Sequence, residues 1–283
     1  MSKLAVNIGP LAVPTQLVVL VICGLVAAAV GYLAGRRQRV SIVGSLLDML
    51  LAGAIAARIV FVVLWFEQYR TAPWSAFDIR DGGFTPWAGI FAAILVALWR
   101  GRRHVALRKP LALGLVAGAM GWLAAPGALR FGADPTLSDL DAIALLTPQG
   151  TPARLVTLAG GKPIVVNLWA SWCPPCQREM PVLAAAQKKR ADVSFVFANQ
   201  GEDLFTLQRY LDAGKLDLAN VVLDSGNGLG QKYGSMALPT TLFYDASGRL
   251  VDTHLGALSA ASLASKLERL EATGAAEPRV LSR

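Results

Sequence analysis

The pattern of apolar and polar positions divides the chain into two halves of different kinds. In the first 132 residues, apolar side chains fill four nearly unbroken runs, at residues 14–35, 42–66, 84–99 and 111–129. A helix needs about 20 apolar residues to cross the hydrocarbon of a bilayer, and the third run is short of that length. The pattern therefore predicts an all-α domain of four transmembrane helices at residues 1–132.

In the second half, short apolar runs alternate with helix-like segments. The run "PIVVNLWA" at residues 163–170 is typical of a strand buried on both faces, and a helix is expected to follow it. Further strand-like runs lie at residues 193–200, 220–224, 240–245 and 250–256. Strands that alternate with helices in this order predict an α/β fold. The expected boundaries are a linker at residues 133–145, the α/β domain at 146–274 and a tail at 275–283.

The charged residues are distributed unevenly between the halves. Residues 1–132 contain thirteen Lys and Arg but four Asp and Glu, whereas residues 133–283 contain fourteen and fifteen. The basic excess belongs to the apolar half, so nucleic acid is not the expected partner. Two basic loops, "RRQR" after the first run and "RGRRHVALRK" after the third, are expected on the cytoplasmic side of the lipid bilayer.

This topology places the N-terminus and the α/β domain on the outer, non-cytoplasmic side of the membrane. A cleaved signal peptide is disfavoured, because the charges near the first apolar run follow it instead of preceding it. The expected location of the α/β domain depends on an even number of spans.

Three residues inside the apolar runs carry a thiol or a charged group. Asp48 and Arg58 are separated by about 15 Å along a helix, too far to pair with each other. Intramembrane charges mark lipid headgroup sites, pathways or interhelix pairs. For Arg58 we consider a headgroup phosphate or a partner on another helix, and Asp48 is expected at the interface. Cys23 stands alone in the first run and is expected to be a small buried residue, because a thiol relay needs a pair.

The chain has three cysteines, and Cys173 and Cys176 are separated by two prolines. This spacing favours an exchangeable pair over a structural disulfide framework, and a zinc site would need further Cys or His ligands that are missing nearby. At a helix start, unpaired N–H groups and the helix dipole stabilise a thiolate, so the pKa of Cys173 should fall and Cys173 should be the attacking thiol. Cys176, one turn on, resolves the mixed disulfide. Pro174 and Pro175 stiffen the turn.

The motif "WCPPCQREMP" and the later "LPTTLF" resemble the thioredoxin fold across residues 146–274. The similarity is greatest to membrane-tethered TlpA/ResA/DsbE-like reductases, in which an acidic residue and a proline follow the second cysteine, as Glu179 and Pro181 do here. The resemblance implies that Pro239 is cis, that Leu238 presents its backbone to an extended client peptide, and that Trp172 covers the thiols and contacts the client.

One position departs from thioredoxin itself. A buried Asp lies six residues before the first cysteine in thioredoxin, and here that position is Asn167, which cannot accept a proton. Glu179, one turn beyond Cys176, becomes the candidate that accepts the proton of the resolving thiol. The alternative for Glu179 is a solvated helix carboxylate.

The membrane half has a resemblance of its own. The segments "GAIAARIVFVVLWF" and "DGGFTPWAGIFAAIL" are similar to part of the prolipoprotein diacylglyceryl transferases. Trp87 stands where that family has a histidine. The resemblance implies a membrane module that has lost the transferase chemistry.

Together these features predict a membrane-anchored periplasmic thiol–disulfide oxidoreductase that reduces oxidised client proteins, with no metal or cofactor. A CcdA/DsbD-like membrane protein is the expected electron donor, because no glutathione pool operates outside the cytosol. Two alternatives stay open. The pair could serve a disulfide oxidase or isomerase, or the helices could form a lipid- or partner-binding module with an appended redox domain. The sequence does not name the client, and apocytochrome cysteines are one candidate.

Overall fold

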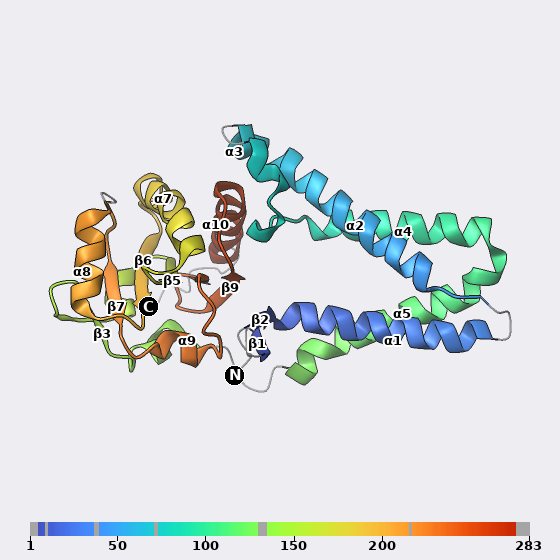
Figure 1. Ribbon diagram of the computed structural model, residues 1–283, viewed down its shortest axis with the longest axis horizontal. Coiled ribbons are helices and arrows are strands. Elements are labelled where there is room, and N and C mark those ends of the chain that lie inside the picture. Colours follow the sequence, from blue (N-terminus) through green and yellow to red (C-terminus); the bar gives the residue numbers. More distant parts are fainter. Residues whose placement is uncertain are drawn as a thin grey trace, which may run out of the picture. The chain divides into compact units, whose positions relative to one another are not determined.

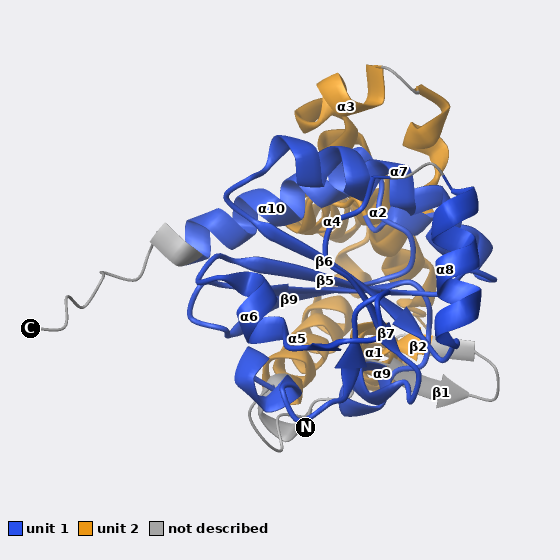
Figure 2. Cartoon of the chain, turned by 90° about the vertical axis from the view of Figure 1, so that its left-hand side faces the viewer, with its two compact units in different colours: residues 1–12, 80–82, 132–283 blue, residues 13–79, 83–131 orange. Residues whose placement is uncertain are grey.

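The chain folds into two compact units. The computed structural model describes residues 5–8, 11–36, 40–70, 73–129, 135–214 and 217–275 (Figure 1). The helical unit contains residues 13–79 and 83–131, and the sheet unit contains residues 1–12, 80–82 and 132–283 (Figure 2).

The helical unit is built from two helix pairs. Helix α1 (Thr15–Gly35) packs along α5 (Arg108–Leu129), and α2 (Val43–Leu64) packs along α4 (Pro86–Arg103). The short elements between them are α3 (Phe66–Arg70), η2 (Pro73–Phe77), η3 (Ile79–Asp81) and η4 (Val105–Leu107). Each of the four apolar runs thus forms a helix. Among the described residues, α1 and α2 are long and apolar enough to cross a membrane, so that property is found for two of the four predicted spans.

Small residues let the paired helices approach closely. A side chain on Gly114 of α5 would place its first carbon 2.6 Å from the carbonyl oxygen of Ala27, and one on Gly121 would come within 3.3 Å of the Cys23 sulfur. In the other pair, Gly53 and Gly89 face each other across a similar contact. Such stripes of small residues are typical of helix packing in membranes. Cys23 is buried in this contact, as expected for a small apolar residue.

Arg58 is buried in the helical unit and binds the backbone of the segment that joins α2 to α4. Its Nη1 donates to the carbonyl of Gly83 at 2.8 Å, and Nη2 donates to Ala76 and Asp78 at 2.9 Å each. The rings of Tyr69 and Phe84 lie 5.6 and 5.8 Å from the guanidinium carbon. These contacts are those of a structural residue, one of the two roles considered from the sequence, and they include Tyr69 of α3 and Ala76 of η2. Arg58 organises the connecting segment.

We expect Arg58→Lys to loosen this segment, because an ammonium group cannot reach carbonyls that a planar guanidinium fork binds together. Loss of two charged hydrogen bonds should make limited proteolysis between α3 and α4 about tenfold faster in detergent-solubilised protein. Arg70→Lys is the matched control, since Arg70 is exposed and pairs with Glu67 of the same helix. Equal cleavage rates for the two variants would contradict the assignment.

The sheet unit contains a seven-stranded sheet in the order β4-β3-β7-β6-β5-β8-β9. Strands β5, β6 and β7 run parallel, β8 is antiparallel to β5, and β9 is antiparallel to β8. The strands are β3 (Leu145–Leu146), β4 (Pro152–Ala153), β5 (Ile164–Trp169), β6 (Ser194–Gln200), β7 (Val221–Asp224), β8 (Thr240–Tyr244) and β9 (Leu250–Leu255). A separate two-stranded sheet, which the sequence pattern did not predict, is formed by β1 (Ala5–Ile8) and β2 (Leu11–Pro14).

Helices cover both faces of the large sheet. The helices are α6 (Leu155–Ala159), α7 (Pro174–Lys189), α8 (Leu204–Ala213), α9 (Gly228–Lys232) and α10 (Ala260–Ala275). Figure 2 shows α7 and α10 on one side of the strands and α6 and α9 on the other. Successive residues of β5 point to opposite faces, so Val165 and Trp169 join the core under α7, α8 and α10, and Val166 and Leu168 join the core over α6 and α9. This arrangement confirms the α/β fold predicted for the C-terminal half.

The segment expected to link the halves contributes to the second of these cores. Leu137 and Leu140, in the short helix η5 (Leu137–Leu140), are buried against the sheet unit. A capping box between Thr136 and Asp139 begins this helix. The packed part of the sheet unit therefore includes residues from 135 onward.

Candidate functional site

The site is centred on a disulfide between Cys173 and Cys176 at the start of α7. Cys173 is the N-cap of the helix, and the Cys176 amide donates to its sulfur at 3.3 Å. Pro174 and Pro175 occupy the first turn, where an N–H group has no partner within the helix. The backbone thus directs a donor at the Cys173 sulfur, which favours an anionic sulfur there once the disulfide is reduced.

The end of β5 and a tight turn place this helix start. Trp169, the last residue of β5, is fully buried, and it contributes to the core as predicted. The next residues turn sharply, and the Cys173 amide donates to the Ala170 carbonyl at 3.2 Å. Between them, Trp172 is 68% exposed. The turn therefore buries both cysteines but leaves an aromatic ring beside them at the surface.

Glu179 lies one turn beyond Cys176 on the buried face of α7. It is 1% exposed, its Oε1 accepts from Asn167 Nδ2 at 2.7 Å, and its Oε2 accepts from the Leu258 amide at 2.8 Å. Burial raises the pKa of Glu179 to about 7, and the two hydrogen bonds only partly oppose this rise. The alternative of a solvated helix carboxylate is therefore wrong. A carboxyl group that titrates near neutrality next to a thiol can exchange protons with it.

Asn167 belongs to the same buried network. Its Nδ2 also donates to Thr241 Oγ1 at 3.0 Å, across the pair of strands β5 and β8. The side-chain amide of Asn167 therefore orients the Glu179 carboxylate. Asn167 occupies the position at which thioredoxin has a buried Asp.

The bond between Leu238 and Pro239 is cis. Pro239 comes immediately before Thr240, which pairs with Leu168 near the end of β5. This register puts Leu238 and Pro239 at the sheet edge from which the disulfide turn begins. Leu238 is half-buried, and it packs against the core cluster that contains both cysteines.

A cavity of about 210 Å³ lies beside this edge. Neutral residues line it: Leu168, Trp172, Gln200, Gly201, Asn227, Gly230, Ser235, Met236 and Leu238. The cavity extends from the exposed ring of Trp172 to Leu238, the residue before the cis proline. A client segment that paired with the backbone of Leu238 would lie in this cavity.

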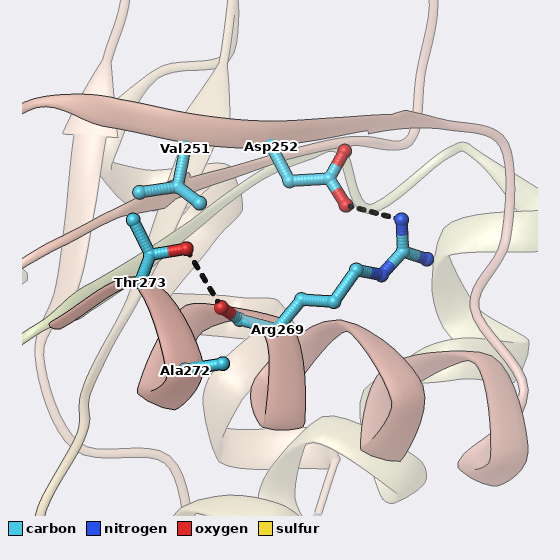
Figure 3. A pocket seen from close by; sticks show the side chains of 5 residues that line it. All are labelled: Val251, Asp252, Arg269, Ala272 and Thr273. Atoms are coloured by element: carbon cyan, nitrogen blue, oxygen red, sulfur yellow. Dashed lines mark hydrogen bonds and ion pairs between the residues drawn. The ribbon is translucent and has the colours of Figure 1, made fainter. Parts of the chain in front are cut away.

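A larger hollow of about 540 Å³ lies between β9 and α10 (Figure 3). Asp252 and Arg269 pair across it at 3.6 Å, and Val251, Ala272 and Thr273 complete its lining. It contains no thiol and its charges are satisfied by each other, so it offers no chemistry for disulfide exchange.

Neither histidine belongs to the site. Burial, aided by the Lys266 ammonium, lowers the pKa of His254 to about 4, which keeps it neutral near pH 7. His104 is exposed between α4 and η4. No group of three potential metal ligands occurs within the residues that the structure describes.

Four residues in and after β6 contribute to the site but were not singled out in the sequence. Gln200, Asn227 and Met236 line the cavity, and Glu202 binds the turn before Cys173. Trp169 pairs with Asn199 in the parallel ladder of β5 and β6, so both strands end at the same edge of the sheet. The segments that follow the two strands therefore begin side by side. That rule could have directed attention to residues 200–202.

Comparisons with known proteins agree on the C-terminal half. Residues 135–269 match the Redoxin family. The chain is 34% identical over 116 residues to the thioredoxin-like protein YneN of Bacillus subtilis, an alignment that covers 39% of this chain and 66% of YneN. It is 34% identical over 101 residues to the thiol-disulfide oxidoreductase ResA of Halalkalibacterium halodurans, covering 35% of this chain and 57% of ResA.

A third relative is the thiol:disulfide interchange protein HelX of Rhodobacter capsulatus. The chain is 30% identical to it over 127 residues, which cover 44% of this chain and 71% of HelX. The chain covers less than two thirds of the length of the first two relatives. The resemblance of the helical unit to prolipoprotein diacylglyceryl transferases is not supported by these comparisons.

Proposed function

Because the chain belongs to the thioredoxin-like thiol–disulfide oxidoreductases of the ResA and HelX kind, we propose that Cys173 and Cys176 exchange disulfides with client proteins outside the cytosol. The observation that carries the proposal is the Cys173 sulfur, which caps α7 and accepts a backbone N–H. In the reduced protein, the Cys173 thiolate attacks a client disulfide. Cys176 then attacks Cys173, the client leaves as a dithiol, and the disulfide of the structure is restored.

The proposed direction is reduction of the client. Resolution needs Cys176 to lose a proton, and Glu179 is a buried acceptor that titrates near neutral pH. Each cycle leaves the pair oxidised, so two electrons must return from a donor, for which a CcdA/DsbD-like membrane protein is the proposed source. The pair needs no metal or cofactor for this exchange.

The proposed location is the periplasmic face of a bacterial inner membrane, with the helical unit as a multi-pass anchor. The apolar helices α1 and α2 support an anchor, and the basic loops after the first and third apolar runs support an even number of crossings. With α4 and α5 as the remaining spans, the sheet unit follows the last helix on the outer side.

The test uses the full chain in detergent, reduced and freed of reductant. We expect it to reduce the disulfides of insulin and to equilibrate with redox buffers below about −200 mV, nearer to thioredoxin than to strong oxidants. A potential near about −120 mV would instead favour the oxidase alternative. In spheroplasts treated with reductant, a membrane-impermeant maleimide should label the dithiol without lysis. Labelling only after lysis would place the sheet unit in the cytosol and end the proposal.

A further inference from the structure

We propose that Glu202 is a positioning residue for Cys173: its carboxylate holds the turn that presents the attacking sulfur. The inference rests on the proposed function and names a residue outside the WCPPC motif. Glu202 follows β6, about thirty residues away in sequence, yet it binds the turn between β5 and α7.

Both oxygens of this carboxylate are committed to the active-site edge. Oε2 accepts from the Ser171 amide at 2.8 Å and from the Asn199 side-chain amide, and Oε1 accepts from the Ser171 hydroxyl. The remaining polar group of Ser171, its carbonyl, accepts from the side-chain amide of Gln177 on α7. Every hydrogen-bonding group of Ser171 is therefore fixed.

Ser171 is the second residue of the turn that the Cys173 amide closes onto Ala170. Fixing it leaves the following backbone little freedom. Cys173 then adopts the extended N-cap conformation, with φ −92° and ψ 105°, in which its sulfur meets the Cys176 amide. A turn that relaxed would move the sulfur off the helix start and weaken the stabilisation of its anion.

Charge and geometry act in opposite directions at this position. A negative carboxylate near Cys173 disfavours the thiolate, whereas the turn that it holds favours the thiolate. A neutral amide in place of the carboxylate can preserve the hydrogen bonds. Its oxygen would accept from the Ser171 and Asn199 donors, and its NH₂ group would donate to the Ser171 hydroxyl.

The neighbouring residue provides a matched control. Asp203 is the N-cap of α8 and accepts from the Thr206 amide at 2.7 Å. Removal of the Asp203 carboxylate weakens the loop after β6 and the start of α8. It leaves the hydrogen bonds of the disulfide turn in place. Any general loosening after β6 would therefore affect Asp203→Ala and Glu202→Ala alike.

The test measures alkylation of Cys173 by iodoacetamide between pH 5 and 9, in the full chain with Cys176→Ser. We expect Glu202→Ala to slow alkylation at pH 6 about tenfold and to move the midpoint of the pH profile upward, which corresponds to a tenfold smaller thiolate fraction. Glu202→Gln and Asp203→Ala should stay within about twofold of the parent. If Glu202→Ala fails to fold, Ser171→Ala, which loses only the hydroxyl donor, should still slow alkylation relative to Asp203→Ala.

Two results would overturn the inference. Equal rates for Glu202→Ala and Asp203→Ala would show that the turn does not need this carboxylate. A loss in Glu202→Gln as large as in Glu202→Ala would show that these hydrogen bonds do not stabilise the thiolate, because the amide preserves them and removal of the negative charge cannot slow alkylation. The proposed function is tested by a different result. It is wrong if the wild-type protein reduces no client disulfide. It stands if the wild-type protein reduces the client and the Glu202 variants merely behave like the controls.

Discussion

Cys176→Ser is expected to accumulate a covalent complex between Cys173 and a client protein, whereas Cys173→Ser is expected to lose disulfide exchange down to the uncatalysed background. The asymmetry follows from the helix start. The Cys173 sulfur caps α7 and receives a backbone N–H, while Cys176 lies within the first turn and is fully buried. Cys173 therefore attacks, and without Cys176 nothing intramolecular releases the client. Non-reducing electrophoresis of the purified variants after incubation with oxidised insulin measures both effects.

Cys23→Ser is the matched control for these variants, because Cys23 is buried between α1 and α5 and has no cysteine partner among the described residues. It should keep the exchange activity of the wild-type protein. The assignment of roles would be reversed if Cys173→Ser trapped the client and Cys176→Ser did not. Full activity of Cys173→Ser would favour the alternative in which the helical unit carries the function.

The features predicted well from the sequence are those that neighbouring residues determine. The buried strand at residues 163–170, the cysteine pair and its prolines all lie within a short stretch, and local backbone rules specify how they fold. The four apolar runs became helices for the same reason, although α4 extends to Arg103, where basic residues complement the C-terminal end of the helix dipole.

The features that were missed depend on contacts between distant segments. Arg58 binds backbone carbonyls of the segment that joins α2 to α4, and the sequence did not indicate these partners. Asp48, expected only at the interface, pairs with Arg100 of α4. Glu202 reaches the disulfide turn only because β5 and β6 are parallel neighbours. Periodicity and motif spacing contain no information about which loop carbonyl or strand end a side chain will meet.

Glu179 could be predicted only in part. Its spacing from Cys176 was visible in the sequence, but its buried environment was not. Its pKa near 7 arises from burial of the carboxyl group, which outweighs the hydrogen bonds from Asn167 of β5 and from Leu258 in the segment before α10. We expect a carboxyl group in this position to serve the exchange reaction and to make the stability of the folded protein depend on pH. Both consequences are measurable in a single variant.

We expect Glu179→Gln to slow release of the reduced client by about a hundredfold, because a positioned acceptor contributes roughly this factor to proton transfer. In the wild-type protein the release rate should rise with pH through about 7, as Glu179 ionises. The variant should lack this rise and recover only at higher pH, where the Cys176 thiol ionises unaided. Stopped-flow tryptophan fluorescence with a model disulfide measures the rate, and Glu268→Gln, an exposed glutamate of α10, is the control.

The same substitution should remove a pH dependence of stability. The pKa of Glu179 lies at about 7 in the folded chain against 4.5 ordinarily, so the folded state binds the proton more tightly. This contribution is fully present below pH 4.5 and is lost as the pH rises through 7, a change of about 3 kcal/mol in the free energy of unfolding. Pulse proteolysis of the oxidised full chain in urea, at pH 5 and pH 8, should detect it in wild-type and Glu268→Gln proteins but not in Glu179→Gln. A slope that persists in Glu179→Gln would mean that another buried group titrates in this range, and the proton acceptor for Cys176 would have to be sought there.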